Sequence, residues 1–273
     1  MLIALTLGLS TDLVLTNLVA TARPTSSSRS GRTTTTPVKK PGQTQPGSTS
    51  KRRSILNFRV SNIRASRNRE AGASRGRCIP QDITALLPAQ AKSSTEKIPV
   101  ELTINHHPTF FINVPENTAT SAEFLLSAED KTPLLREDID LTAKNAGIIG
   151  YTLPKSFKGL ETGKKYRWRF TLLCDPEDRS GNPRTSGWVE KIEPTATVAK
   201  QLKAATTLDE RAAIYASTGY WQDTLKALTD LRTANPNDQD IVASWNNVLS
   251  SVGLKSLAQK PVFEVTGKPS EGL

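Results

Sequence analysis

The chain has 273 residues, a formal net charge of +10, and only 5% aromatic residues. The positive excess is confined to residues 23–77, which contain 14 Lys or Arg and a single acid, Glu70. The rest of the chain is close to neutral, which argues against a basic folded domain of the kind that binds nucleic acids.

Residues 1–22 are rich in leucine and end in Ala20-Thr21-Ala22, the small-x-small pattern that precedes signal cleavage. We expect a secretory signal peptide, and therefore an exported protein of the periplasm or cell envelope. No Lys or Arg precedes the apolar run, and Asp12 interrupts it. A membrane span is disfavoured, because it needs about 20 apolar residues. A cytosolic protein with an apolar N-terminus is the alternative.

Residues 23–77 form a basic segment of Ser, Thr, Pro, Gly and Arg, a composition typical of disorder. We expect a spacer, or a weak contact with an anionic polymer or a lipid surface. Phe58 is its single aromatic residue, so it lacks the stacking platform of a nucleic-acid-binding segment. A brief local structure or docking stretch is indicated by its few large apolar residues, Ile55, Leu56, Phe58, Val60 and Ile63.

The chain contains two cysteines, Cys78 and Cys174. In an oxidising compartment such a pair is typical of a disulfide, whereas in the cytosol the two would be separate thiols. A bridge would close a loop of roughly 95 residues, to which the chain-entropy model assigns about 4–5 kcal/mol.

The region from 78 to 193 shows short runs of alternating apolar residues between turn residues, which predicts an antiparallel β-sandwich. Seven strands are expected, at 100–104, 109–114, 122–128, 134–139, 148–153, 165–174 and 188–193. In the strongest of them, one face consists of Tyr166, Trp168, Phe170, Leu172 and Cys174, so we expect that face to lie in the core.

The run from Leu160 through Gly163 to Tyr166 resembles the tyrosine corner of fibronectin type III and other immunoglobulin-like sandwiches. The resemblance implies structural roles: the glycine forms the tight turn, and the tyrosine hydroxyl bonds back to the backbone. Trp168 and Trp188 are further structural positions of the predicted sandwich.

After Pro194 the apolar spacing becomes helical and predicts four short helices within 194–254. Tyr215, Gly219 and Trp221 lie at positions that resemble one tetratricopeptide hairpin, although Thr224 stands where that repeat prefers alanine. A single such hairpin must pack against something else, and the sandwich is the nearest apolar surface. Residues 255–273 are expected to be a disordered tail. The predicted fold is therefore α+β, an immunoglobulin- or fibronectin III-like antiparallel sandwich followed by a bundle of short helices.

Several longer runs carry a family resemblance: RGRC (75–78), ITALLP (83–88), HPTFFINVP (107–115), YRW (166–168), CDPEDRSGN (174–182) and GWVEKIE (187–193). In combination they resemble a cyanobacterial family known as domain of unknown function 928. The resemblance covers about residues 75–255 and implies no activity, only a tendency to follow a signal peptide. Both cysteines fall within these runs, which fits a bridge.

The best candidates for a metal site are oxygen-bearing residues of one loop, Asp175, Glu177, Asp178 and Asn182. Their spacing does not match an EF-hand, and the alternative is a turn in which Asp and Asn bond their own backbone and Gly181 takes a positive φ. The two histidines, His106 and His107, are adjacent, so on a strand they would point to opposite faces and not share a metal. We therefore predict no metal and no cofactor.

No catalytic residue is predicted, because the sequence contains no nucleophile elbow, phosphate-binding glycine loop or zinc-protease helix. The hypothesis that fits best is a non-catalytic interaction module that presents its surface to an unknown envelope protein or glycan. The alternatives are a carboxylate-dependent hydrolase acting on envelope glycan, and nucleic-acid binding through residues 23–77, which the missing stacking platform disfavours.

Overall fold

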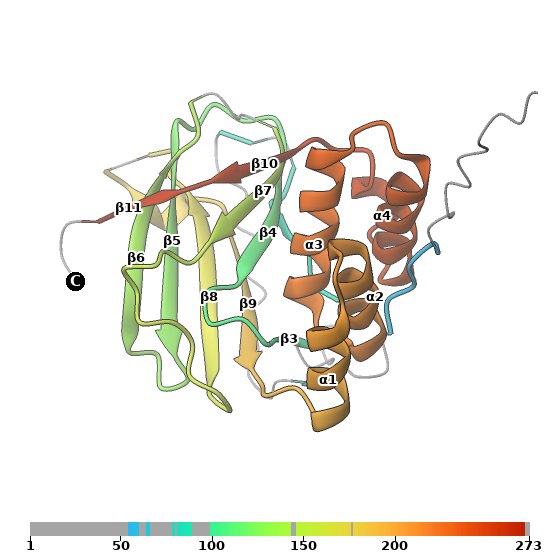
Figure 1. Cartoon of the computed structure of the whole chain (residues 1–273). Coiled ribbons are helices and arrows are strands. Elements are labelled where there is room, and N and C mark those ends of the chain that lie inside the picture. The colour runs from blue at the N-terminus through green and yellow to red at the C-terminus, as the bar shows by residue number, and fades with distance from the viewer. Residues whose placement is uncertain are drawn as a thin grey trace, which may run out of the picture. The chain divides into compact units, whose positions relative to one another are not determined.

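The structure is a computed structural model that describes residues 54–59, 64–65, 78–79, 81–88, 99–142, 146–175 and 177–270. These residues form two β-sheets and a layer of helices that stack in the order large sheet, small sheet, helices (Figure 1). The signal peptide expected at 1–22, and most of the basic segment 23–77, lie outside the described residues.

The larger sheet has seven strands in the order β1-β3-β9-β8-β5-β6-β11. All neighbours are antiparallel except β3 and β9, which are parallel. The bounds are β1 Arg64–Ala65, β3 Pro99–Thr103, β5 Ser121–Ala128, β6 Pro133–Asp140, β8 Lys165–Leu172, β9 Arg184–Lys191 and β11 Gly267–Pro269.

The smaller sheet has four strands in the order β10-β7-β4-β2, with β10 parallel to β7. The bounds are β2 Thr84–Ala85, β4 Thr109–Val114, β7 Gly147–Thr152 and β10 Val262–Val265. Together the two sheets contain all seven strands predicted from the apolar alternation, with ends that differ by a few residues.

The core of the sandwich is aromatic. Phe124 of β5 lies between Tyr151 and Phe110 of the other sheet, with ring centroids 4.3 and 5.1 Å away. Phe110 also contacts Trp168 of β8, at 5.2 Å. The face predicted to be buried in β8 is confirmed, because Tyr166, Trp168, Phe170 and Leu172 are all buried. Aromatic pairs at these separations add to the apolar burial that holds the sheets together.

Four helices follow the sandwich, as predicted: α1 Ala196–Ala204, α2 Leu208–Thr218, α3 Trp221–Ala234 and α4 Gln239–Ser251. Local sequence explains their ends. Thr207 and Glu210 form a reciprocal capping box at the start of α2. Gly219 ends that helix at φ 84°, a conformation that side chains with a Cβ disfavour. None of the helices in the described part of the chain is long and apolar enough to cross a membrane.

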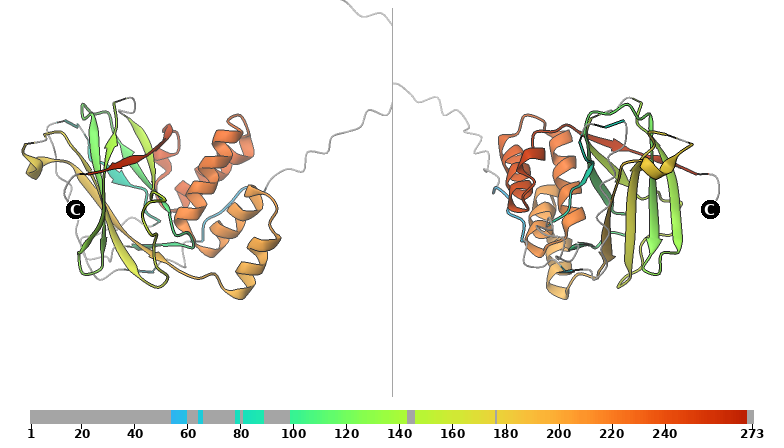
Figure 2. Two further views of the ribbon diagram at one scale, coloured as in Figure 1. Left: turned by 60° about the vertical axis from the view of Figure 1, so that its left-hand side comes forward. Right: turned by 180° about the vertical axis from the view of Figure 1, so that it is seen from behind.

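Helices α3 and α4 cover the outer face of the small sheet, as the two views of Figure 2 show. Phe111 and Ile148 point out of that sheet and pack in one cluster with Trp221, Leu225 and Trp245. The single helical hairpin therefore packs on the sandwich, as expected. Thr224 is fully buried there, and its hydroxyl donates to the Tyr220 carbonyl at 2.7 Å, which accommodates a polar group where alanine was expected.

The prediction of a disordered tail is wrong for most of residues 255–273. Strand β10 joins the small sheet and β11 joins the large one, so the chain crosses from one sheet to the other along an edge of the sandwich (Figure 1). Beneath this crossing the Tyr151 hydroxyl donates to Glu137 at 2.7 Å. Gly267 is needed there, since a Cβ would overlap the Glu137 side chain. The run is only a few residues long, which is why its pattern was missed.

Candidate functional site

Cys78 and Cys174 form a disulfide with a Cα–Cα distance of 5.6 Å, which confirms the predicted bridge. The bond connects the segment before β2 to the residues that follow β8, and both cysteines pack against the sandwich core. Its place in the fold is structural.

The run resembling a tyrosine corner has the expected local geometry. The Tyr166 hydroxyl accepts a hydrogen bond from the backbone N–H of Glu161 at 3.0 Å. Gly163 adopts φ 78°, and Leu160 is fully buried. The residues therefore shape the turn before β8 and leave no reactive group free.

The candidate metal loop directs its oxygens toward its own backbone. Asp175 Oδ1 accepts from the amides of Glu177 and Asp178, at 2.9 and 3.0 Å. Asn182 Oδ1 accepts from the amides of Cys174 and Asp175, each at 3.1 Å. The alternative of a self-bonded turn thus describes the loop. In the described residues no three His, Cys, Asp or Glu side chains are grouped so that they would hold a metal ion.

The expectation that Gly181 takes a positive φ is wrong. The side chain of Asp178 accepts from the Ser180 amide and caps a short 3₁₀-helix, Arg179–Gly181. Gly181, the last residue of that helix, does not have a positive φ. The turn is stabilised by the side chain of Asp178, so it does not need the conformational freedom of the glycine.

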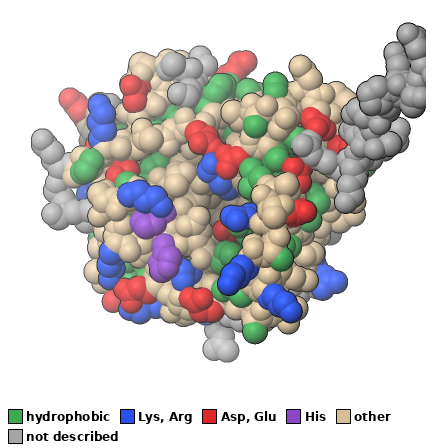
Figure 3. All heavy atoms as spheres, in the orientation of Figure 1, with side chains coloured by type: hydrophobic (Ala, Val, Ile, Leu, Met, Phe, Trp, Pro, Cys, Tyr) green, Lys and Arg blue, Asp and Glu red, His purple; other side chains and the backbone are tan. Residues whose placement is uncertain are grey.

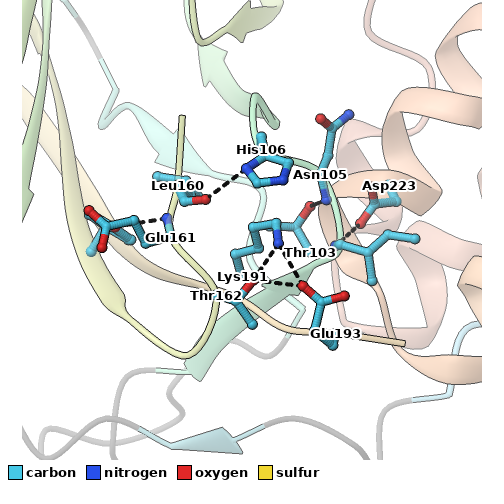
Figure 4. Close-up of polar contacts among 11 residues, drawn as sticks. Thr103, Asn105, His106, Leu160, Glu161, Thr162, Lys191, Glu193 and Asp223 are labelled. Atoms are coloured by element: carbon cyan, nitrogen blue, oxygen red, sulfur yellow. Dashed lines mark hydrogen bonds and ion pairs between the residues drawn. The ribbon is translucent and has the colours of Figure 1, made fainter. Parts of the chain in front are cut away.

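The two histidines lie in the loop between β3 and β4, side by side on the face shown in Figure 3. His106 Nδ1 bonds the Leu160 carbonyl at 3.1 Å (Figure 4), and His107 Nε2 bonds the Phe157 carbonyl at 2.9 Å. A carbonyl oxygen only accepts, so both nitrogens carry hydrogen. Gly159 allows this close approach, because a Cβ there would lie 3.0 Å from His106 Cβ. The histidines fasten one loop to another.

Next to His106 lies a charged cluster that the sequence did not reveal. The Lys191 side chain is 3% exposed, and its Nζ donates to Thr162 Oγ1 at 2.5 Å and to Glu193 Oε1 at 3.1 Å (Figure 4). Hydrogen bonds from Thr162 and Lys191 hold the pKa of Glu193 below its usual value. The ion pair ties the tyrosine-corner turn to the end of β9 and provides no unpaired base.

The contact between α3 and β3 contains two buried acids. Glu101 of β3 accepts from Trp168 Nε1 at 3.0 Å and from Gln222 Nε2 at 2.6 Å. Burial raises the pKa of Glu101 to about 8. Glu101 Oε1 and Gln222 Oε1 are also buried, and neither has a hydrogen-bond partner in the described part of the chain.

Asp223 is the second of these acids, and it lies in the first turn of α3. Its carboxylate accepts from the Ile104 amide at 3.1 Å, as Figure 4 shows, and it also interacts with Thr103. Burial raises the pKa of Asp223 to about 6. Burial therefore shifts both acids toward the neutral form relative to exposed carboxyl groups, and they position α3 on the sheet through hydrogen bonds to neutral groups.

Residues Ser54–Arg59, which we call the resident segment, contact the helices from outside the helical layer. Leu56 N donates to Ser244 Oγ at 3.1 Å, and Arg59 N donates to the Ala216 carbonyl at 3.0 Å. Asn247 Nδ2 donates to the Leu56 carbonyl at 3.4 Å. The prediction of disorder is therefore wrong here, and a docking stretch is confirmed for Leu56 and Phe58; Val60 and Ile63 lie outside the described residues.

The resident segment alternates in burial like an extended peptide bound on one face. Phe58 is 5% exposed and packs edge-on against Trp221, with ring centroids 4.7 Å apart. Leu56 is partly buried in the same direction. Ile55 is 49% exposed, and Asn57 is exposed as well. We call the surface of α2, α3 and α4 that receives Leu56 and Phe58 the helical groove.

Part of the helical groove is unfilled. A cavity of about 190 Å³ lies beside Ser54 and Leu56. Its remaining lining combines apolar side chains with carboxylates, namely Ala213, Leu228, Leu231, Ile241, Ser244, Asp209, Glu210 and Asp240. The groove therefore has an apolar floor and an acidic border.

Comparison with known protein families shows which family the chain belongs to. Residues 70–262 match the family described as Domain of Unknown Function (DUF928). The chain belongs to this family. The match includes both cysteines, the strands from β2 to β9 and all four helices, and it starts after the resident segment. No curated protein matches this DUF928 chain.

The DUF928 chain also has a shallow cavity of about 710 Å³ where β10 passes to β11. Its lining includes hydroxyl side chains and three acids, Asp138, Asp140 and Glu264. Two of these acids have structural partners: Asp140 accepts from the Thr142 amide at 2.9 Å, and Glu264 pairs with Lys226 at 3.1 Å. The helical groove, in contrast, already holds an extended peptide segment, so we take it as the candidate functional site.

Proposed function

We propose that this DUF928 chain is a non-catalytic interaction module that binds extended polypeptide segments in its helical groove. The observation that carries the proposal is the resident segment itself, which is held through backbone hydrogen bonds and the Phe58 anchor. Backbone contacts with alternating side-chain pockets are how extended peptides are commonly recognised. The sandwich is the rigid support, related to fibronectin III domains, and α2 and α3 correspond to a tetratricopeptide-like hairpin.

The proposal places the protein in the periplasm or cell envelope, with the part of residues 23–77 that precedes the resident segment as a spacer or electrostatic tether. Its support is the leader-like composition of residues 1–22 together with the Cys78–Cys174 disulfide, since such bonds persist in oxidising compartments. N-terminal sequencing of the protein from an envelope fraction tests this. A mature terminus at Arg23 is expected, whereas a retained leader in a cytosolic fraction contradicts export.

Peptide binding is tested with a labelled peptide of the resident sequence, residues 54–59, titrated onto the full chain and followed by fluorescence anisotropy. Wild type should bind it poorly, because the groove is occupied and the tethered segment has a high effective concentration. The Phe58→Ala chain should bind it at least tenfold more tightly, because its own anchor is lost. Ile55→Ala is the matched control, since that side chain points away from the groove. Equal binding to all three chains contradicts the proposal.

A further inference from the structure

The contact between Glu101 of β3 and Gln222 of α3 leaves one oxygen of each side chain without a donor. Glu101 Oε2 accepts from Gln222 Nε2 at 2.6 Å and from Trp168 Nε1 at 3.0 Å. Glu101 Oε1 and Gln222 Oε1 are buried as well, and neither finds a partner among the residues that the structure describes. Two buried acceptors on groups already joined by one hydrogen bond are unfavourable unless a hydrogen lies between them.

A neutral carboxyl group has the O–H donor that this contact requires. With a proton on Oε1, Glu101 donates to Gln222 Oε1 while Gln222 Nε2 donates to Glu101 Oε2, so the acid and the amide share two hydrogen bonds. Burial raises the pKa of Glu101 to about 8, although the hydrogen bonds from Trp168 and Gln222 act in the opposite direction. The acid therefore keeps its proton at neutral pH.

The charged side chains around this pair belong to other contacts. Asp223, also on α3, accepts from the Ile104 amide at 3.1 Å. Lys191 of β9 pairs with Glu193 at 3.1 Å. Strand alternation places the other charged side chains of β8 and β9 on the opposite face of the sheet, namely Lys165, Arg167, Arg169, Arg184 and Glu190. Above pH 7, ionisation of Glu101 is thus the event that changes the charge of this contact.

The acid–amide pair lies one residue from the anchor of the helical groove. Trp221, which precedes Gln222, packs against Phe58 with ring centroids 4.7 Å apart. The Trp221 indole N–H also donates to the Leu86 carbonyl at 2.7 Å. An ionised Glu101 brings a buried negative charge against Gln222 Oε1, which is unfavourable in a dry contact. Movement of the first turn of α3 away from β3 relieves this conflict by admitting water, and it carries Trp221 away from Phe58.

We infer that a proton shared by Glu101 and Gln222 holds the first turn of α3 on β3, and that the helical groove releases its peptide when this proton leaves to solvent. The inference rests on the proposed function, because it names the regulation of the same groove. Its sign is fixed: the groove binds at neutral pH and loses affinity as the pH rises.

The test measures how the full Phe58→Ala chain binds an N-acetylated, labelled peptide of residues 54–59, by fluorescence anisotropy at pH 7 and pH 9. The affinity should fall about tenfold, because the fraction of chains with a protonated Glu101 falls by that factor when the pKa is about 8. Adding Glu101→Gln should abolish the fall, since an amide N–H replaces the carboxyl proton. Adding Glu123→Gln is the matched control: that carboxyl lies on the other face of the large sheet, so the fall should remain.

A direct measurement of the proton separates the two proposals. Infrared difference spectra of the wild-type chain between pH 7 and pH 9 should show the loss of one protonated carboxyl band, which the Glu101→Gln chain lacks. Gln222→Met should shift that band to higher frequency, because the carboxyl group loses its partner. Peptide binding that is independent of pH, or that falls equally with Glu101→Gln, overturns the inference while peptide binding stands. If no peptide binds at either pH, the proposed function fails; a wild-type spectrum without the band overturns the shared proton by itself.

Discussion

The small sheet is covered on its two faces in different ways. Toward the large sheet it meets a core of aromatic side chains, led by Phe124, Tyr151 and Trp168. Toward the helices the packing is apolar in the middle, but α3 also reaches past the sheet to bury Gln222 and Asp223 against β3. The centre of the sandwich core thus consists of uncharged rings, whereas the position of α3, which forms part of the groove, depends on the protonation of buried acids.

The largest expected effect tests whether the sandwich dominates stability. Replacing Cys78 and Cys174 together by serine should lower the free energy of unfolding by about 4–5 kcal/mol, because the bond joins residues 96 apart in the chain. Urea denaturation followed by circular dichroism measures the loss, and the reduced wild type should match the double variant. A loss below about 1 kcal/mol would show that the unfolded chain gains little freedom without the bond.

The next prediction concerns the aromatic core. Phe124→Ala should cost about 4 kcal/mol, since the ring is fully buried and its removal leaves a cavity between the sheets. The loss should be the same at pH 5 and pH 8, because the removed ring contacts the uncharged rings of Phe110, Tyr151 and Trp168. Ile55→Ala, an exposed apolar change, is the control and should be neutral in the same denaturation assay.

The α3–β3 contact, unlike the aromatic core, should make the stability of the protein depend on pH. The pKa of Glu101 is raised from its ordinary value of 4.5 to about 8 in the folded protein. Between these two pH values the folded state holds a proton that the unfolded state has released. Stability should therefore fall as pH rises through this window, and Asp223, with a pKa of about 6, adds only to the lower part. Glu101→Gln should abolish the decline between pH 6 and 8 and gain on the order of 3 kcal/mol at pH 8.

Thermal unfolding from pH 5 to pH 9 measures this pH dependence. Glu123→Gln is the matched control: that carboxylate accepts from Arg179 at 2.9 Å, so its loss should destabilise the protein. If Glu101→Gln and wild type lose stability in parallel above pH 6, Glu101 is ionised in the folded protein. The proposed difference in pH dependence between the aromatic core and the α3–β3 contact would then be wrong.

The smallest effect is expected at the turn before β8. Tyr166→Phe keeps the buried ring and removes the hydroxyl that accepts from the Glu161 amide, so it should cost about 1 kcal/mol. Tyr215→Phe on α2, a half-exposed position, is the matched control. Chemical denaturation distinguishes the two, and an equal, negligible change in both would remove the stabilising role of the corner.

The sequence predicted those parts of the fold that are encoded locally. Alternation identified β3 to β9 but not β2, and the helical spacing identified all four helices. The count of two cysteines indicated the bridge. What could not be predicted depends on partners far along the chain: nothing near Glu101 indicates that Gln222 will cover it. Strand β10 was missed because four residues between Pro261 and Thr266 carry too little pattern to distinguish a strand from a loop.

The crossing of residues 262–269 between the sheets has a consequence for the order of folding. Its strands pair with β7 and β6, more than a hundred residues earlier, and they are the last described strands to be synthesised. Before β10 and β11 pair, the edges of β7 and β6 that they cover are exposed, and Gly267 does not yet pack against the Glu137 side chain. The pairing of β10 and β11 is therefore a late, long-range step that joins the two sheets along one edge, and such late long-range pairing slows folding.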